Sequence, residues 1–515
     1  MWSERASQSE HESLVARLRR ILPAPDPDTH ASTWEWALKV APDSFAGEKI
    51  APTPEQVATN LQEPGFSWLN GANGPRLFSR PIATISYTRA LTPGEKGTAR
   101  VSGPGGSAEF ETCGFDLLEA ALEAWKGPES AELVGYLSYD LAAELEDVGE
   151  VPEEDIGVPA LYFNLYAESL EYRDGVWRAR GTNAWDRHCG AMFSKGEFEA
   201  LISGSAQPDT EERTKQSLHG GPVIRSKPDQ AGFEGSVAKI VNEIHNGDYF
   251  QTNLCRSIEA NLEAPRNASA VEWEGVGAWK LFRRMREISP ARYEAFLRLS
   301  PVGLEEQAVA SISPELFLKL DGPPGARIAE SQPIKGTRPR GATPEQDRAL
   351  LEELLASEKD RAELAMIVDV VRNDLSRVCV AGTVEVTEHA APMTLPTVHH
   401  SYSTVRGRLR EGEDAVSLLR AAFPAASISG APKIAAIAAA YQQEKQLRGP
   451  AMGAIGWISM DGRMEMSVAI RTAFVADGVV RYYAGCGITA DSDPAAEFEE
   501  SSHKAAAFLR ALGRD

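Results

Sequence analysis

The sequence predicts a large protein of the α+β or α/β class, because strand-like and helix-like segments are mixed along the chain. Apolar and polar residues alternate, as they do in strands, at 381–388, 403–409, 453–459 and 466–475. Residues 233–247 instead carry apolar side chains at the spacing of a helix with one apolar face. The hydrophobic share of 43% is ordinary for a globular protein, so the chain has material for a large core.

The first half of the chain begins with a polar lead-in, residues 1–30, in which a helix is expected at 9–21. Residues 31–202 form the N-terminal part of the fold, where 134–146 is expected to be a strand that turns into a helix. Residues 203–230 are polar and rich in Gly, Pro and charge, which indicates a surface linker or insertion.

The second half, residues 231–515, has a sharper pattern. Residues 248–262 alternate like a strand. Thr343 and Gln346 have the spacing of a capping box, and Pro344 occupies the first helical position between them. We therefore expect a long helix to begin there and to run through 350–371.

Composition excludes several classes of function. The formal charge of −21 argues against a surface for nucleic acid or for an anionic membrane. The five cysteines are scattered without a CxxC pair, which favours free thiols in a reducing cytoplasm over disulfides or a zinc site. Neither a signal peptide nor an apolar run of 18 residues is visible, so no membrane span is expected.

Lys335 is the first candidate for chemistry. It lies in AESQPIKGTRPRG, 329–341, between Pro333 and Pro339, which restrain the backbone and hold the lysine in place. Burial disfavours the charged form of an amine, so a lysine in a partly desolvated cleft can act as a nucleophile. Taken alone, the residue would more often be an ordinary surface-loop lysine.

Carboxylates form a second group of candidates. Glu363 shares a helix face with an apolar stripe within 357–378, and Glu497 and Glu500 share a face of a helix that Asp493 caps. Three such carboxylates suit a hard, oxygen-ligated cation such as Mg²⁺. Acidic helices are common without a metal, so the spacing alone is a weak signal.

Three further segments suit an anionic ligand. Gly485 and Gly487 allow backbone amides to approach a ligand, and the turn at 430–433 precedes an Ala-rich helix whose N-terminus favours anions. Arg471 lies in an apolar strand, 466–475, where an unpaired charge is costly. It should therefore meet a carboxylate, either of the protein, in a structural ion pair, or of a ligand.

Together and in this order, these segments resemble the chorismate-utilising enzymes, a family that includes anthranilate synthase component I, aminodeoxychorismate synthase component I and the isochorismate and salicylate synthases. The resemblance is strong over 231–510 and thinner over 60–150, through FSWLNGA and GYLSYDL. It implies an α+β fold of the anthranilate synthase component I type. Two large antiparallel sheets would face each other, with helices packed outside and the active site in a cleft between the sheets.

The resemblance also implies roles for single residues. Lys335, Glu315 and His400 match catalytic residues, and Glu363 and Glu500, with Glu497 nearby, match the ligands of Mg²⁺. The positions that match substrate-binding groups are Gln251, Thr337, Gly430, Ala431, Pro432, Lys433, Arg471, Gly485, Cys486 and Gly487.

Lys335 and Gln251 decide which family member the chain is most similar to. At the position of Lys335, the family's anthranilate synthases carry Ala, whereas its aminodeoxychorismate synthases carry Lys. At the position of Gln251, isochorismate and salicylate synthases carry a Lys that activates water. Glutamine cannot act as a general base at neutral pH, which argues against both of these activities. The resemblance is therefore closest to aminodeoxychorismate synthase component I, on the route to para-aminobenzoate and folate. No cysteine-based glutaminase motif is present, so a separate glutaminase subunit is the implied partner.

Some positions depart from the family pattern. Trp457 is expected where the family has a Tyr that meets the pyruvyl carboxylate, Glu465 stands in place of Asp, and Cys486 in place of a small residue. The stretch from Trp68 to Gly71 appears in place of the Leu-Leu-Glu-Ser segment that contributes to a tryptophan pocket in inhibited anthranilate synthases. Two alternatives stay open: an anthranilate synthase component I, and a non-catalytic member that acts as a binding subunit.

Overall fold

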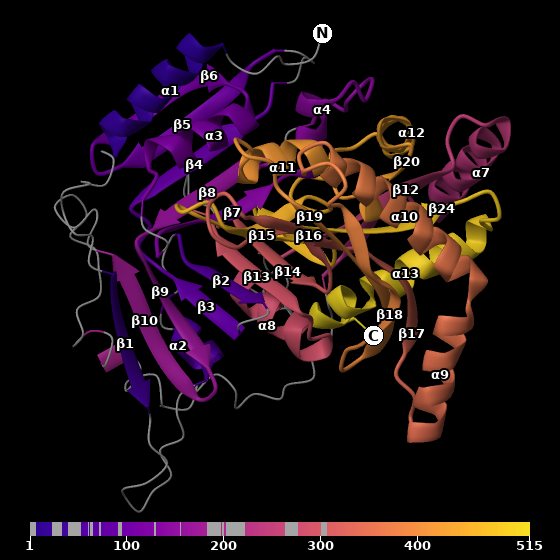
Figure 1. Cartoon of the computed structure of the whole chain (residues 1–515). Helices are drawn as coiled ribbons and strands as arrows, with labels where there is room; N and C mark the ends of the chain where they lie inside the picture. Colours follow the sequence, from indigo (N-terminus) through magenta and orange to yellow (C-terminus); the bar gives the residue numbers. More distant parts are fainter. Residues whose placement is uncertain are drawn as a thin grey trace, which may run out of the picture.

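The computed structural model places two large β-sheets at the centre of the molecule, with helices on the outside (Figure 1). It describes residues 7–22, 33–39, 53–59, 61, 65–71, 74–90, 95–127, 130–154, 156–182, 197, 200–201, 222–262, 277–299 and 306–514. Both sheets take strands from both halves of the sequence, so the halves are interleaved. The expected α+β architecture with two facing antiparallel sheets is confirmed.

Sheet A has twelve strands, and all of its pairings are antiparallel. Their order across the sheet is β1 (Thr33–Lys39), β10 (Val176–Thr182), β9 (Glu168–Arg173), β3 (Gly74–Phe78), β2 (Ser67–Gly71), β13 (Tyr293–Arg298), β14 (Ala308–Ser313), β23 (Thr472–Ala476), β24 (Val479–Ile488), β12 (Gln251–Asn261) and β11 (Ile224–Lys227), with β20 (Gly430–Ala431) on β12.

Sheet B also has twelve antiparallel strands. Their order is β17 (Ile334–Pro339), β19 (Val398–Arg408), β16 (Ile328–Gln332), β15 (Leu316–Asp321), β22 (Met464–Val468), β21 (Ala454–Ser459), β7 (Glu132–Leu137), β8 (Leu161–Tyr166), β4 (Ala83–Thr88), β5 (Gly97–Gly103) and β6 (Gly106–Thr112), with β18 (Glu385–Thr394) on β19.

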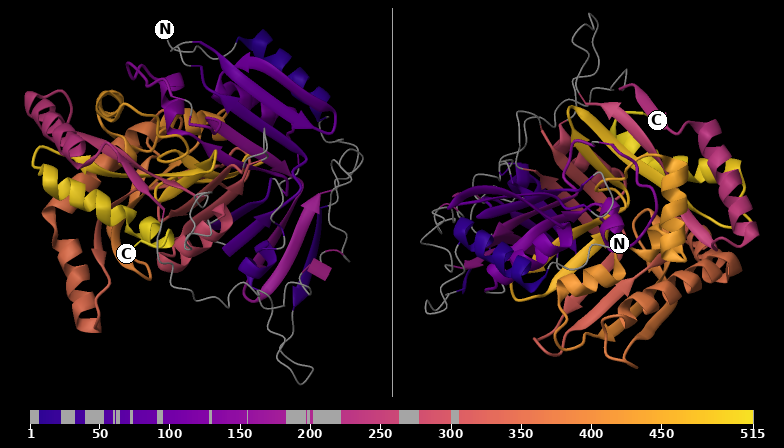
Figure 2. Two further views of the ribbon diagram at one scale, coloured as in Figure 1. Left: turned by 180° about the vertical axis from the view of Figure 1, so that it is seen from behind. Right: turned by 90° about the horizontal axis from the view of Figure 1, so that it is seen from above.

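Helices cover the outer faces of both sheets (Figure 2). On sheet B lie α1 (Gln8–Ile21), α3 (Gly114–Ala124), α9 (Pro344–Ala356), α10 (Glu358–Ser376) and α11 (Ala415–Ala422). On sheet A lie α2 (Pro54–Thr59), α7 (Gln230–Asn246), α8 (Ala278–Ile288), α12 (Lys433–Glu444) and α13 (Pro494–Ala511). The short helices are η1 (Tyr139–Leu141), α4 (Ala142–Leu145) and η3 (Ala426–Ile428).

Alternation along the strands of sheet A separates an inner face from an outer face. On β12, Cys255 joins the core between the two sheets, whereas Leu254 packs outward under α7 and α12. On β24, Tyr483 likewise joins the inner core, whereas Cys486 lies in the outer cluster. The same parity puts Gln251 and the Gly485 and Gly487 positions on the inner face, which looks toward sheet B.

Several boundaries differ from those expected. The long helix is two helices, because Ser357 ends α9 and caps α10 by accepting a hydrogen bond from the Asp360 amide. The strand expected at 466–475 is also divided, into β22 and β23, and Arg471 lies in the connection with φ of +51°. The expected helix starts at Thr343 and Asp493 are confirmed.

The two polar segments are described only in part. Of the expected linker 203–230, residues 222–230 are described; they form β11 and the first residue of α7, and the rest lies outside the described residues. Within the N-terminal lead-in, α1 packs against α3 through Leu14, Leu18 and other apolar residues. No helix among the described residues is long and apolar enough to cross a membrane.

Candidate active site

Lys335 lies where the two sheets meet. A bulge in the pairing of β17 with β19 falls at Gly336, which has φ of +84°. The Lys335 ammonium extends to 3.5 Å from the Glu363 carboxylate on α10, and both side chains are largely buried, with 15% and 18% exposed. A Cβ atom placed on Gly487 would lie 2.8 Å from the Lys335 nitrogen and 2.4 Å from the Gln251 amide nitrogen. The sequence-predicted Lys335, Glu363, Gln251 and Gly487 are therefore brought together.

Gln251 is fully buried on the inner face of β12. Neither its amide nitrogen nor its amide oxygen has a hydrogen-bond partner in the described part of the chain. A buried amide without partners is costly, so this side chain is suited to a polar ligand in the cleft.

Glu315 follows β14 and is 4% exposed. Burial raises the pKa of its carboxyl to about 7, although Ser427, the Ile334 amide and Lys335 oppose this shift. At neutral pH the group is therefore divided between acid and base, as a proton donor that is later an acceptor needs to be. Ser427 was not among the predicted site residues, because no pattern in the sequence indicates that it lies beside Glu315.

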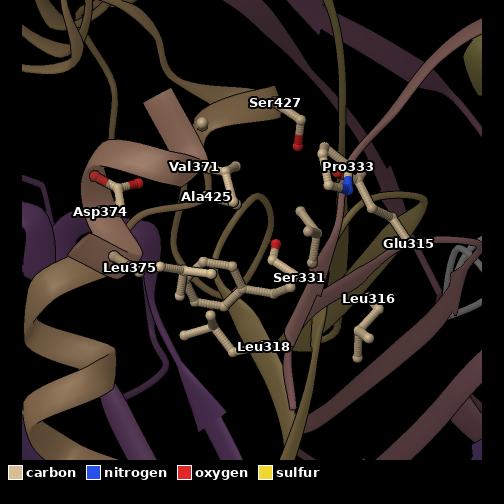
Figure 3. A pocket seen from close by; sticks show the side chains of 14 residues that line it. Glu315, Leu316, Leu318, Ser331, Pro333, Val371, Asp374, Leu375, Ala425 and Ser427 are labelled. Atoms are coloured by element: carbon tan, nitrogen blue, oxygen red, sulfur yellow. The ribbon is translucent and has the colours of Figure 1, made fainter. Parts of the chain in front are cut away.

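A cavity of about 10 Å³ lies beside Glu315, which is room for about one water molecule (Figure 3). Glu315, Pro333 and Ser427 line one side, and Val371 and Asp374 of α10 line the other. Ser427 Oγ is buried and close enough to the Glu315 carboxyl to lower its pKa.

His400 pairs across the strands with Thr337, and 3.0 Å separates its Nδ1 from the Thr337 hydroxyl. Burial, together with the nearby Arg471 charge, lowers the pKa of His400 to about 4, so the imidazole is neutral at neutral pH. Its Nε2 is buried and lacks a partner within the described ranges. The two predicted residues are therefore held together, with one ring nitrogen left for a ligand.

Arg471 forms no ion pair with any carboxylate of the described residues. Burial lowers the pKa of this guanidinium. The structural ion pair that the sequence left open is thus not formed there, and the charge remains for an anionic ligand.

The turn at 430–433 is positioned by β20, which pairs with Gln251 and Thr252. Gly430 has φ of +141°, and a Cβ there would lie 2.2 Å from the Gln251 carbonyl oxygen. Ala431 and Pro432 lead into α12. The Lys433 ammonium binds Asp374 and the Ala422 carbonyl, each at 2.7 Å. The expectation that Lys433 adds free charge to an anion site is therefore wrong, because Asp374 already neutralises it.

The two predicted carboxylates near the C-terminus, Glu497 and Glu500, have different partners. The Glu500 carboxylate is 2.7 Å from the Lys504 ammonium, which also donates to the Gly485 carbonyl at 2.9 Å. Burial raises the pKa of Glu500, but Lys504 and Lys335 outweigh it and the net shift is downward. Glu497 accepts a hydrogen bond from Ser492 at 2.6 Å. The Lys504 contact was not predicted, although its i,i+4 spacing from Glu500 was a usable signal.

Two groupings of these residues could hold a cation. Ligand atoms of Cys486, Glu497 and Glu500 lie within 4.8 Å of one another, but Cys486 is on the outer face of the sheet. In the cleft, Lys335 contacts Glu363 and lowers the pKa of Glu500. The Lys335 ammonium lies 3.5 Å from Glu363 and its charge also acts on Glu500, so a positive charge already lies near both carboxylates, whose hard oxygen donors suit Mg²⁺. Glu497, held by Ser492 beside Cys486, fits that set less well.

Trp457 borders a different cavity from the one beside Glu315. This cavity has a volume of about 50 Å³, and Asn70, Gly71, Arg76 and Glu465 also line it. The Arg76 guanidinium lies over the Trp457 ring at 5.5 Å, while it also binds Glu132 and Glu171. The sequence left open whether the Trp457 indole donates to the substrate; in the structure Trp457 lines this second cavity, which lies between residues of both sheets.

A lysine, two glutamates and an arginine that has no carboxylate partner in the described part of the chain form an arrangement suited to a small anionic molecule. The chain belongs to the family of chorismate binding enzymes, whose family profile matches residues 70–510.

Individual relatives agree with this assignment. The chain is 36% identical over 407 residues to anthranilate synthase component 1 of Streptomyces coelicolor, which covers 75% of this chain and 74% of that protein. It is 31% identical over 435 residues to aminodeoxychorismate synthase component 1 of Bacillus subtilis, covering 84% and 87%. Its fold is similar to the crystal structure of anthranilate synthase component I from Streptococcus pneumoniae, with a TM-score of 0.67, 24% identity, and 88% and 93% of the two chains covered.

The raised pKa of Glu315 predicts a measurable effect on stability. A carboxyl with a pKa of about 7 when folded, against 4.5 as its ordinary value, holds its proton more tightly in the folded state. The protonated carboxyl therefore adds to the free energy of unfolding at low pH, and this stabilisation is lost as the pH rises through 7. The unmodified chain should therefore lose free energy of unfolding between pH 4.5 and pH 8, and Glu315→Gln should not. Relative to the unmodified chain, the variant's free energy of unfolding should rise by up to about 3 kcal/mol over this range.

Denaturant unfolding at the two pH values measures this difference. Glu345→Gln, at an exposed position in α9, is the matched control and should follow the unmodified chain. If the stability of Glu315→Gln and of the unmodified chain changed with pH in parallel, the raised pKa of Glu315 would be contradicted.

Proposed function

We propose that the chain is an aminodeoxychorismate synthase component 1, which converts chorismate and ammonia to 4-amino-4-deoxychorismate. The observation that carries this proposal is the position of Lys335, buried at the junction of the sheets and close to both Glu363 and the acid Glu315. A nucleophile beside a group that can give and take a proton is the arrangement that covalent catalysis requires.

The polar groups without partners supply a place for the substrate's charges. Arg471 would bind one carboxylate of chorismate, and the neutral His400, with the Thr337 hydroxyl donating to Nδ1, would donate to the other through Nε2–H. The backbone at Gly485 and Gly487 allows close approach on the inner face of β24. Gln251 would contact the ring side of the substrate with its free amide.

The proposed reaction has two displacements. Lys335, once it has lost a proton to solvent, attacks C2 of chorismate through its neutral amine, the C4–oxygen bond breaks, and Glu315 gives its proton to the departing hydroxyl, which leaves as water. Ammonia then attacks C4, the bond from C2 to Lys335 breaks, and the Glu315 carboxylate takes back a proton from the new amine. Two successive displacements give net retention at C4.

Glu363 and Glu500 would hold Mg²⁺ together with a substrate carboxylate. When bound, the ion would neutralise negative charge close to the ring, as Lewis acids do in other sites. In the free protein these two carboxylates are instead balanced by Lys335 and Lys504.

The source of ammonia is proposed to be a second chain. Relatives of this chain carry the designation component 1, and no cysteine-based glutaminase motif occurs in its sequence. A glutaminase subunit would therefore deliver ammonia, and the product would serve para-aminobenzoate and folate synthesis.

Anthranilate synthase component 1 is the second candidate, because a relative of that name is 36% identical. Such an enzyme adds the amino group at the ortho position and needs no lysine nucleophile. The buried Lys335 at the centre of the site therefore favours the first proposal.

Replacing the nucleophile tests the proposal directly. With chorismate, Mg²⁺ and an ammonium salt, the unmodified chain should make aminodeoxychorismate, and Lys335→Ala should lose activity by about a hundredfold or more. Liquid chromatography with mass spectrometry distinguishes aminodeoxychorismate from anthranilate. Anthranilate from the unmodified chain would support the second candidate, and no turnover would indicate a binding subunit. Full aminodeoxychorismate formation by Lys335→Ala would exclude the covalent route.

The use of nitrogen donors tests the partner. The purified single chain should turn over chorismate with ammonium and should be inactive with glutamine as the only donor. Glutamate release from glutamine, measured in the same assay, checks this. Glutamine-dependent turnover by the pure chain would disprove the need for a second subunit.

The cavity beside Trp457 leads to a prediction about tryptophan. Asn70 and Gly71 lack the carboxylate and hydroxyl of the Leu-Leu-Glu-Ser segment, and Asn70 donates to Glu294 instead. A Cβ on Gly71 would lie 2.6 Å from Glu465 Oε1, so Glu465 occupies the adjoining space. Each lost buried hydrogen bond costs about 1–3 kcal/mol, and two such losses weaken binding by roughly a hundredfold or more.

Free tryptophan should therefore not inhibit the ammonium-dependent rate. A titration of that rate with tryptophan measures the effect, with 5-methyltryptophan as a second indole. Half-inhibition at micromolar tryptophan would show that the cavity opens to admit the amino acid.

A further inference from the structure

Each of the two carboxylates that could hold a cation already has a lysine beside it. The Lys335 ammonium is 3.5 Å from Glu363 Oε2, and the Lys504 ammonium is 2.7 Å from Glu500 Oε1. Lys335 also lowers the pKa of Glu500, so its positive charge acts on both carboxylates. The cleft thus balances its two acids with ammonium groups before any ion or substrate enters.

The two lysines are held differently. Lys504 has a second anchor, because it donates to the Gly485 carbonyl at 2.9 Å and so stays attached to β24. The Lys335 ammonium forms no hydrogen bond within the described ranges and is held near Glu363 by charge alone. Of the two, Lys335 is therefore the one that can be displaced without breaking a backbone contact.

A divalent cation bound by Glu363 and Glu500 would enter the space in which the Lys335 charge acts. Like charges a few ångströms apart repel strongly where solvent is excluded. Lys335 is 15% exposed and Glu363 18%, so water screens this repulsion poorly. Close contact of Glu363 with both cations at once is therefore unfavourable.

We propose that the Lys335 ammonium is the resident counter-ion of Glu363 and competes with the divalent cation for it. Cation binding and the release of Lys335 from Glu363 are then a single coupled event. The side chain becomes free to reach the substrate only when the cation site is filled. This proposal rests on the function and cation site proposed above, and it adds the order in which the site is assembled.

Lys359 offers a matched control on the same carboxylate. Its ammonium lies 4.0 Å from Glu363 Oε1, one helical turn away on α10, but its side chain is 65% exposed. Water and salt screen a pair of this kind, which contributes little. Competition at Glu363 should therefore come from Lys335 and hardly from Lys359.

Cation binding measured without substrate tests the proposal. Isothermal titration with Mg²⁺, and Mn²⁺ titration followed by electron paramagnetic resonance, give Kd for the full chain and its variants. Lys335→Met and Lys335→Gln remove the charge and should tighten binding about tenfold or more. Lys335→Arg keeps the charge and should stay within about threefold of the unmodified chain, as should Lys359→Met. Circular dichroism confirms that each variant is folded.

The outcomes separate the proposals. Unchanged Kd in both Lys335→Met and Lys335→Gln overturns the competition, even if the chain still forms aminodeoxychorismate. Equal tightening in Lys359→Met would overturn it too, because a general loss of positive charge would then explain the effect. Binding that Glu363→Gln leaves intact, or no binding in any variant, overturns the site itself. Tightening confined to the uncharged Lys335 variants supports the competition whichever amination product the chain forms.

Discussion

The missing side chain at Gly487 is the constraint on which the cleft depends. Gly487 lies on the inner face of β24 in sheet A, and Lys335 comes to it from β17 in sheet B. A Cβ atom at this position would lie 2.8 Å from the lysine nitrogen and 2.4 Å from the Gln251 amide. Any larger residue would displace the Lys335 ammonium and the Gln251 amide from their positions. Gly430 imposes a similar constraint on the Gln251 backbone, because a Cβ atom on Gly430 would lie 2.2 Å from the Gln251 carbonyl oxygen.

One positive charge stays unbalanced against the sign of the whole molecule. The chain carries a formal charge of −21, yet Arg471 has no carboxylate partner among the described residues, whereas Lys335 is paired with Glu363. An anionic substrate therefore depends on local fields, because the overall field repels it. Lys433 shows how selectively the charges are used, since Asp374 removes it from the binding surface.

The sequence was a good guide wherever one segment determines its own structure. The helix starts at Thr343 and Asp493 follow from local hydrogen bonds, and the antiparallel sheets follow from a set of motifs typical of one family. The break at Ser357 was missed because a serine within a helical pattern is compatible with either outcome, and only packing of α10 against the sheet decides it.

The contacts of the site were harder to predict than its residues. The sequence singled out Lys335, Glu315, His400 and Arg471 as candidates, but the residues near them come from distant parts of the chain. The burial of Ser427 beside Glu315 and the pairing of Lys433 with Asp374 depend on three-dimensional packing. The motif around Trp457 did not show which part of the space between the sheets this side chain borders, because its contact with Arg76 of sheet A depends on three-dimensional packing.

The interleaving of the sheets has a consequence for biosynthesis. Strand β7 pairs with β21, and β2 is joined through β13 and β14 to β23. Strands that are synthesised early therefore cannot complete their pairing until strands near the C-terminus have been synthesised. Until the ribosome has released the C-terminal segment, the nascent N-terminal strands have unpaired edges that invite association with other chains. A chain of this topology gains more from chaperones during translation than one whose neighbours in space are neighbours in sequence.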